Sequence, residues 1–241
     1  MTIRPNLYDY LKILALVAMI IDHIWYYLYP EQFRLRVLGW VAFPLFLFLV
    51  WYNQSYRWRR NLTILAIIIQ LLIWLMWRYW YPSVSPVINI LWVVVLTRFM
   101  MTYVSTRNIW IQASLMISAF VLMPWTWTYL DYGTMALGFA ILGYRARKYF
   151  SWWVVWSIIW ANILYILLMI VHRSFPPLTR WILTGEILIL SASMIWLMRS
   201  RNLTLQTQTQ LDIVVTYISS YAIWIYVIHG IVLIWLAWMR H

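Results

Sequence analysis

Long apolar stretches alternate with short polar ones along the whole chain. The pattern predicts helices over residues 7–29, 37–52, 62–80, 87–104, 109–127, 134–144, 150–171, 181–198 and 213–238. A helix needs about 20 mostly apolar residues to cross a bilayer, so most of these stretches predict membrane spans. The stretch 134–144 is short and predicts a tilted or half-spanning segment. We therefore predict an all-α polytopic transmembrane helical bundle of about nine helices (eight to ten), forming a single domain over residues 1–241.

The composition agrees with a lipid-facing surface. Hydrophobic residues make up 65% of the 241 positions and charged residues only 10%, whereas a soluble domain carries roughly 25% charged residues. The formal net charge is +12, from 18 Lys and Arg against 6 Asp and Glu. Cytoplasmic loops of membrane proteins collect such an excess, and anionic headgroups attract it. We therefore expect a lipid bilayer, and no nucleic acid, as the partner of the basic residues.

The basic residues also predict an orientation. With strict alternation of the predicted helices, the strongest clusters fall on the same side of the membrane as the N-terminus; they are Arg57, Arg59 and Arg60, then Arg145, Arg147 and Lys148, then Arg199 and Arg201. Because Lys and Arg accumulate in cytoplasmic loops, the N-terminus is predicted to lie in the cytoplasm.

Several kinds of chemistry are excluded by the sequence itself. The chain has no Cys, which rules out disulfides, thiolate metal sites and a Cys nucleophile. It also has no HExxH motif, Walker loop or GxSxG elbow. The histidines are too scattered along the chain to argue a metal site, so we predict no metal.

Charged residues inside the first apolar run are the strongest functional signal. A charge at the centre of a membrane helix costs roughly 2.5–3.5 kcal/mol, yet this run contains Lys12, Asp22 and His23. Eleven residues separate Lys12 from His23, which at about 100° per residue places both on one face, about 16 Å apart. This geometry suits a long anionic ligand that enters from the cytosol. The alternative is a snorkelling lysine and a hydrogen-bonded histidine inside a bundle.

A second signal is the pair Arg57 and Arg60 at the cytoplasmic start of the third predicted helix. Residues three apart share a helix face, and Arg59 adds charge beside them. Guanidinium groups bind phosphate through two parallel hydrogen bonds. The alternative is the ordinary positive charge of a cytoplasmic loop.

Three further candidates lie within apolar runs: His229 in the last one, Glu186 in the eighth and Arg98 in the fourth. A buried neutral histidine needs only one or two hydrogen bonds, so His229 fits a structural role as well as a chemical one. Glu186 and Arg98 could each pair with another polar group in the bundle, and the alternative for Arg98 is that it snorkels. The sequence assigns neither of them a role.

Three segments carry a resemblance to a known family. The stretches LKILALVAMIIDHI (Leu11–Ile24), LGWVAFPLFLFLV (Leu38–Val50) and IYVIHGIVLI in the last helix resemble the TraX family, membrane proteins associated with pilin N-terminal acetylation and fimbrial assembly. The chain is thereby also similar to the wider transmembrane acyltransferase superfamily, which includes acyltransferase family 3.

Two motifs of that superfamily have counterparts here. Its Arg/Lys-x10-His pattern in the first helix is matched by Lys12 and His23, and its Arg-x-x-Arg pattern in the third by Arg57 and Arg60. The chain departs from the pattern at Gly39-Trp40, where Gly-Arg is usual, and it lacks the Tyr-Asn-Gly-x-Arg-Gly loop before the last helix.

The resemblance implies an enzyme of the bacterial inner membrane. His23 would be catalytic, with Asp22 orienting it indirectly, and Lys12, Arg57, Arg60 and Arg59 would hold the phosphates of coenzyme A. An acetyl group would pass from cytoplasmic acetyl-CoA to an acceptor amine or hydroxyl, first the pilin N-terminus and alternatively a cell-surface glycan. General-base catalysis and a transient acetyl-histidine both stay open.

A rival interpretation comes from another class of protein. A transporter or a pilus-assembly factor without chemistry could use Asp22, His23, Glu186 and His229 as a proton relay. Transporter folds often show internal repeats, and we find none in this sequence. A third interpretation, a purely structural membrane protein, predicts that replacing Lys12 and His23 by apolar residues stabilises the protein.

Overall fold

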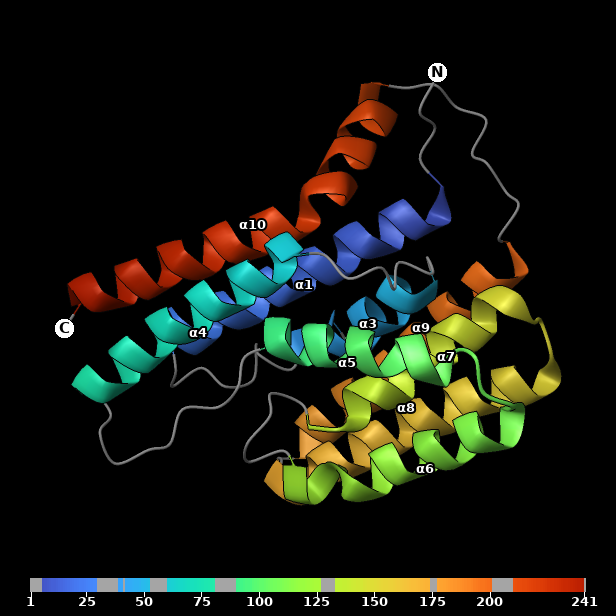
Figure 1. Ribbon diagram of the computed structural model, residues 1–241. Helices are drawn as coiled ribbons and strands as arrows, with labels where there is room; N and C mark the ends of the chain where they lie inside the picture. The colour runs from blue at the N-terminus through green and yellow to red at the C-terminus, as the bar shows by residue number, and fades with distance from the viewer. Residues whose placement is uncertain are drawn as a thin grey trace. The chain divides into compact units, whose positions relative to one another are not determined.

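The computed structural model describes residues 6–29, 39–40, 42–52, 60–80, 90–126, 133–173, 177–200 and 210–240, and the elements formed there are α-helices (Figure 1). They are α1 (Leu7–Leu28), α3 (Ala42–Tyr52), α4 (Arg60–Trp80), α5 (Ile90–Val104), α6 (Ile109–Thr126), α7 (Met135–Lys148), α8 (Trp152–Arg173), α9 (Pro177–Arg199) and α10 (Gln210–Arg240). The predicted all-α class is confirmed. Each predicted helix has a counterpart whose ends differ by a few residues.

The helices differ in whether they can cross a membrane. Leu7–Leu28, Ile109–Thr126 and Trp181–Arg199 are long and apolar enough to do so, and Ile213–Ala222 with Trp224–Leu233 makes a fourth candidate in two bent arms. Shorter apolar helical segments in the described part of the chain are Ala42–Tyr52, Asn61–Leu75, Ile90–Val104 and Trp152–Leu168. These candidate spans and short apolar segments together are typical of a multi-pass membrane protein.

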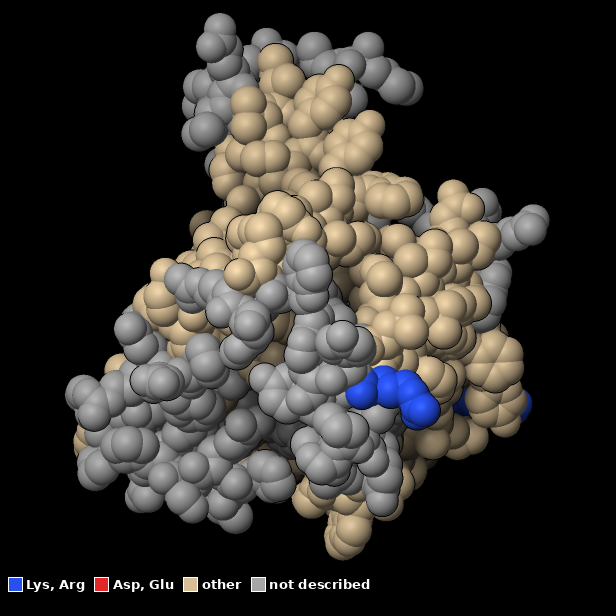
Figure 2. Space-filling model, turned by 90° about the vertical axis from the view of Figure 1, so that its left-hand side faces the viewer, with Lys and Arg blue, Asp and Glu red and all other residues tan. Residues whose placement is uncertain are grey.

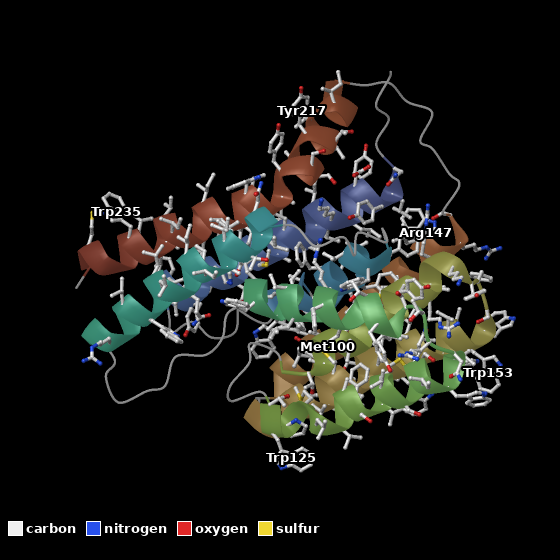
Figure 3. All side chains as sticks on the ribbon, in the orientation of Figure 1. Met100, Trp125, Arg147, Trp153, Tyr217 and Trp235 are labelled. Atoms are coloured by element: carbon white, nitrogen blue, oxygen red, sulfur yellow. The ribbon has the colours of Figure 1, made fainter. Side chains whose placement is uncertain are left out.

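Apolar side chains cover much of the described exterior. Trp125 is 67% exposed, Trp153 82% and Trp235 53%, and all three point outward from their helices (Figure 3). The described atoms on the face in Figure 2 belong almost entirely to residues other than Lys, Arg, Asp and Glu. In water, apolar surface of this extent would drive association. In a membrane the same surface is favourable, because lipid tails accept apolar side chains and the membrane–water interfaces accept Trp in particular.

The chain forms two compact units. One combines Met1–Leu49 with Tyr149–His241, and the other is Val50–Lys148. The first unit contains α1, α8, α9 and α10, and the second contains α4 to α7. The single domain over residues 1–241 stays a prediction.

Helix α7 is the core of the second unit. It packs against α5 and α6, and its residues from Met135 to Tyr144 are all buried. Gly138 of α7 lies against the ring of Phe120 on α6. With 14 residues, α7 is shorter than the about 20 that a full span requires. The segment that the sequence predicts as tilted or half-spanning is therefore a short buried helix.

The turn between α5 and α6 is closed by Gln112. Its side-chain amide donates to the carbonyl oxygens of Val104 at 2.9 Å and Arg107 at 3.0 Å, and its oxygen accepts a hydrogen bond from Nε of Arg145 on α7. The last carbonyls of a helix have no partner within that helix, so Gln112 supplies one at the end of α5.

In the first unit, α1 begins at a capping box. The side chain of Asn6 accepts a hydrogen bond from the backbone N–H of Asp9, and the Asp9 carboxylate accepts one from the backbone N–H of Asn6. This reciprocal pair satisfies two backbone donors at the helix start. Helix α1 then packs along α10, where Leu16 and Met19 meet the fully buried Ala222.

Candidate active site between α1 and α10

Lys12 and His23 both bind α10. The Lys12 ammonium donates to the carbonyl oxygen of Ser219, and Nδ1 of His23 lies 2.8 Å from Nε2 of His229. Ser219 precedes His229 along α10 as Lys12 precedes His23 along α1, so the two helices run in the same direction (Figure 1). The face that the eleven-residue spacing predicts for Lys12 and His23 is the face of α1 that packs on α10.

The Lys12 end of this face is a small charged network. The hydroxyl of the buried Ser219 donates to Oδ1 of Asp9 at 2.6 Å, while Oδ2 of Asp9 serves the capping box. Ser219 therefore contacts a cation through its carbonyl and a carboxylate through its hydroxyl. Asp9 is missing from the sequence prediction because its spacing from Asn6 signals only the start of a helix.

The His23 end is an aromatic cluster. The rings of His23 and His229 have centres 5.0 Å apart and planes 18° apart, and their facing nitrogens are 2.8 Å apart. The nitrogens therefore lie near the line between the ring centres, which is the geometry of an in-plane hydrogen bond and not of face-to-face stacking.

Two tyrosines surround this histidine pair. Tyr27 lies 6.1 Å from His23, and Tyr226 lies 5.7 Å from His23 and 5.4 Å from His229, measured between ring centres. Tyr226 is three residues before His229, which puts both on one helix face. The Tyr-x-x-His spacing is the sequence signal that identifies Tyr226. Because aromatic rings displace water, the cluster gives the histidines a partly desolvated environment.

A bend in α10 separates the two ends of the site. The arms Ile213–Ala222 and Trp224–Leu233 meet at 69°, with Ser219 on the first arm and His229 on the second. The sequence predicts one helix over residues 213–238 and gives no signal of this bend.

Side-chain donors contact backbone carbonyls of α10 beside the bend. The carbonyl of Ser219, which in an α-helix is the acceptor for the N–H of residue 223, the position between the two arms, accepts a hydrogen bond from Lys12. The hydroxyl of Ser220 also donates to the carbonyl of Thr216, four residues earlier, at 2.8 Å. Side-chain hydrogen bonds to helix carbonyls of this kind commonly accompany helix bending.

Asp22 lies on another side of α1. It is 5% exposed, and a Cβ atom placed on Gly39 would lie 2.1 Å from its Cβ. Asp22 thus packs against the segment of Gly39, about 100° around the helix from His23. Its role in orienting His23 stays a prediction.

The other predicted site residues are not brought to this interface by the described structure. Arg57, Arg59 and the side chain of Arg60 lie outside the described residues, and Arg60 begins α4. Their role in binding phosphate stays a prediction. Arg98 is buried in α5, within the second unit.

Glu186 is a buried carboxylate on α9, at 8% exposure. Among the described residues, neither of its side-chain oxygens has a hydrogen-bond partner. Among all the residues that the structure describes, no group of three His, Asp or Glu side chains lies close enough together to hold a metal ion.

These observations define an all-α membrane protein with a lysine and a histidine pair between its first and last helices. The chain belongs to the TraX protein family, whose sequence profile matches residues 8–146. The match includes Lys12, Asp22 and His23, whereas Glu186 and His229 lie beyond it.

A curated relative extends the comparison. The chain is 30% identical over 147 residues to an uncharacterized protein of Rickettsia prowazekii (strain Madrid E), and the alignment covers 60% of this chain and 57% of that protein. The chain thus spans little more than half the length of the relative it matches. No solved structure matches the chain.

Proposed function

We propose that this protein is a membrane-embedded acetyltransferase that moves an acetyl group from cytoplasmic acetyl-CoA to an acceptor amine or hydroxyl. The observation that supports the proposal is the common placement of Lys12 and His23 on the α10-facing side of α1. Membership of the TraX family, a family associated with pilin N-terminal acetylation, agrees with it. The proposal places the protein in the bacterial inner membrane with its N-terminus in the cytoplasm.

Lys12 suits the anionic end of the donor. Its ammonium donates to the neutral carbonyl of Ser219, and a phosphate oxygen is a stronger acceptor because the hydrogen bond is then charge-assisted on both sides. Binding would replace the first bond by the second. The distance of about 16 Å along α1 leaves room for the pantetheine arm between a phosphate at Lys12 and a thioester at His23. The predicted phosphate ligands Arg57, Arg59 and Arg60 would complete the donor site.

His23 suits the reacting end. As a general base it takes a proton from the neutral acceptor amine or hydroxyl while the acceptor atom forms a bond to the thioester carbonyl carbon. The carbon–sulfur bond then breaks, and the thiolate of coenzyme A leaves with the proton that His23 has taken. A route through acetyl-histidine would use the same imidazole as the nucleophile.

The acceptor that we favour is the N-terminal amine of pilin, following the association of the TraX family. A hydroxyl of a cell-surface glycan is the alternative, following acyltransferase family 3. Both acceptors would reach the acetyl group from the outer half of the membrane.

A transfer assay tests the proposal. The full chain in nanodiscs is given radiolabelled acetyl-CoA together with a peptide carrying a free N-terminal amine or with a surface polysaccharide. We expect label in one of the two acceptors and release of one coenzyme A thiol for each acetyl group transferred. If the protein neither binds acetyl-CoA nor labels either acceptor, the proposal is wrong.

Replacing Lys12 by methionine should weaken donor binding. A hydrogen bond to a charged group contributes about 1.5–3 kcal/mol, so we expect the KM for acetyl-CoA to rise about 10- to 100-fold with a much smaller change in kcat. The KM is measured at saturating acceptor.

Lys148→Met is the matched control for Lys12→Met, because Lys148 is the other lysine of the sequence. It lies at the end of α7, 6.0 Å from the ring centre of Tyr144. If the KM for acetyl-CoA rises equally in both variants, Lys12 acts only through its general positive charge and does not bind acetyl-CoA directly.

The buried carboxylate of Glu186 favours a second candidate function. A proton-coupled transporter would use such a group as a proton carrier, and Glu186 has no hydrogen-bond partner among the described residues. Proton flux into proteoliposomes that depends on Glu186, without binding of acetyl-CoA, would favour the transporter.

A further inference from the structure

The hydrogen bonds of His229 determine which of its nitrogens carries the proton. Its Nδ1 lies 3.0 Å from the carbonyl oxygen of Ile225, and a carbonyl oxygen can only accept a hydrogen bond. Nδ1 of neutral His229 therefore carries the hydrogen. Its Nε2 then has a lone pair and acts as an acceptor.

This tautomer of His229 in turn determines the tautomer of His23. Nδ1 of His23 lies 2.8 Å from Nε2 of His229. Since that nitrogen of His229 is an acceptor, Nδ1 of His23 is the donor and carries the hydrogen. In neutral His23 the basic lone pair is consequently on Nε2.

We propose that His229 is a positioning residue that holds His23 in the tautomer with a basic Nε2, so that Nε2 of His23 is the atom that takes the acceptor's proton. The inference rests on the proposed function, and it assigns His229 the role of orienting the base through the chain of bonds from Ile225. The general principle is that the hydrogen bond at one imidazole nitrogen determines the reactivity of the other.

The same bond supports the imidazole after proton transfer. When Nε2 of His23 takes a proton, the ring becomes a cation and its Nδ1–H bond to His229 becomes charge-assisted and stronger. His229 stays neutral, because its own hydrogen remains on Nδ1 against the Ile225 carbonyl. The proton on Nε2 of His23 then passes to the departing thiolate, which restores the starting tautomers.

Three substitutions of His229 vary the acceptor that is offered to Nδ1 of His23. The amide oxygen of glutamine is separated from Cβ by the same number of bonds as Nε2 of histidine. His229→Gln therefore retains an acceptor for Nδ1 of His23. In asparagine the polar atoms correspond to Nδ1, so His229→Asn keeps a polar amide but withdraws the acceptor. His229→Ala removes both. Glutamine is also the amide closer to histidine in volume, so both a packing role and the positioning role rank it first, and the nitrogen of His23 that carries the proton is the readout that separates them.

We expect the acetyl-transfer kcat of His229→Gln to stay within about tenfold of the unmodified protein, and that of His229→Asn and His229→Ala to fall about 100-fold or more, the low end of general acid–base contributions. Equal rates for the glutamine and asparagine variants would overturn the proposal. His172→Asn makes the same chemical change at a histidine of α8 and is expected to leave the rate unchanged.

A spectroscopic measurement tests the tautomer without any transfer reaction. NMR of the full chain containing isotope-labelled histidine reports which ring nitrogen of His23 carries the proton, with the His23 signals assigned by their loss in His23→Ala. We expect Nδ1 in the unmodified protein and in His229→Gln, and a shift toward Nε2 in His229→Asn. A proton on Nε2 of His23 in the unmodified protein overturns the inference. If the tautomer is as expected but no acetyl group is transferred, the proposed function fails while the tautomer assignment stands.

Discussion

Replacement of His23 by alanine is expected to lower the rate of acetyl transfer by about 10²- to 10⁴-fold, the range that a positioned general base contributes. The substitution removes the imidazole that meets His229 and leaves the Lys12–Ser219 contact in place. Binding of acetyl-CoA should therefore be almost unchanged, so that the loss appears in kcat and not in KM. The measurement is transfer of labelled acetyl at saturating donor, beside a direct binding titration.

The fold should tolerate this change. A single hydrogen bond contributes about 0.5–1.5 kcal/mol to stability, and the apolar contacts of α1 with α10 through Leu16, Met19 and Ala222 are not altered. His172→Ala on α8 is the control for the loss of a histidine. If the His23→Ala variant still acetylates at the full rate, His23 is not the catalytic base. The role of His229 in positioning that base would then also be wrong.

Replacement of Gly39 by alanine is expected to lower the free energy of unfolding by about 3 kcal/mol, at the upper end of the usual cost of overpacking. The added Cβ would lie 2.1 Å from Cβ of Asp22 and 2.9 Å from the carbonyl oxygen of Ala18. These are atoms of α1 close to or within its backbone, so the helix itself must shift to make room. Small residues at helix contacts permit this kind of close approach in membrane proteins.

The other glycines supply a graded control series. At Gly138 the nearest atom to an added Cβ is in the ring of Phe120, at 2.6 Å, and a ring can turn where a backbone cannot, so Gly138→Ala should cost less than Gly39→Ala. At Gly185 nothing lies within 4 Å. Gly185→Ala should raise stability by up to about 1 kcal/mol, the helix propensity difference.

Thermal unfolding in detergent ranks these glycine variants. The sequence contains no Cys and 20 Trp, so intrinsic tryptophan fluorescence is the suitable probe and a thiol-reactive dye is not. Equal melting temperatures for Gly39→Ala and Gly185→Ala would contradict the close approach of Gly39 to Asp22.

The sequence by itself determined the helices and part of the site. Apolar runs of membrane-spanning length predict all-α structure because, in lipid, backbone groups have to be satisfied within each segment. Helical periodicity alone predicts that Lys12 and His23 share a face, since both residues belong to one helix and the rotation per residue is known.

The tertiary structure alone decided what that face meets. His229 is 206 residues from His23, and Ser219 is 207 residues from Lys12. Periodicity gives the direction of a side chain but not the identity of the helix opposite, because the chain contains several apolar helices of similar composition. The bend of 69° in α10 likewise has no signal in the sequence of that helix. The pairing of the two histidines follows from packing, and it is packing that gives His23 a partner able to fix its tautomer.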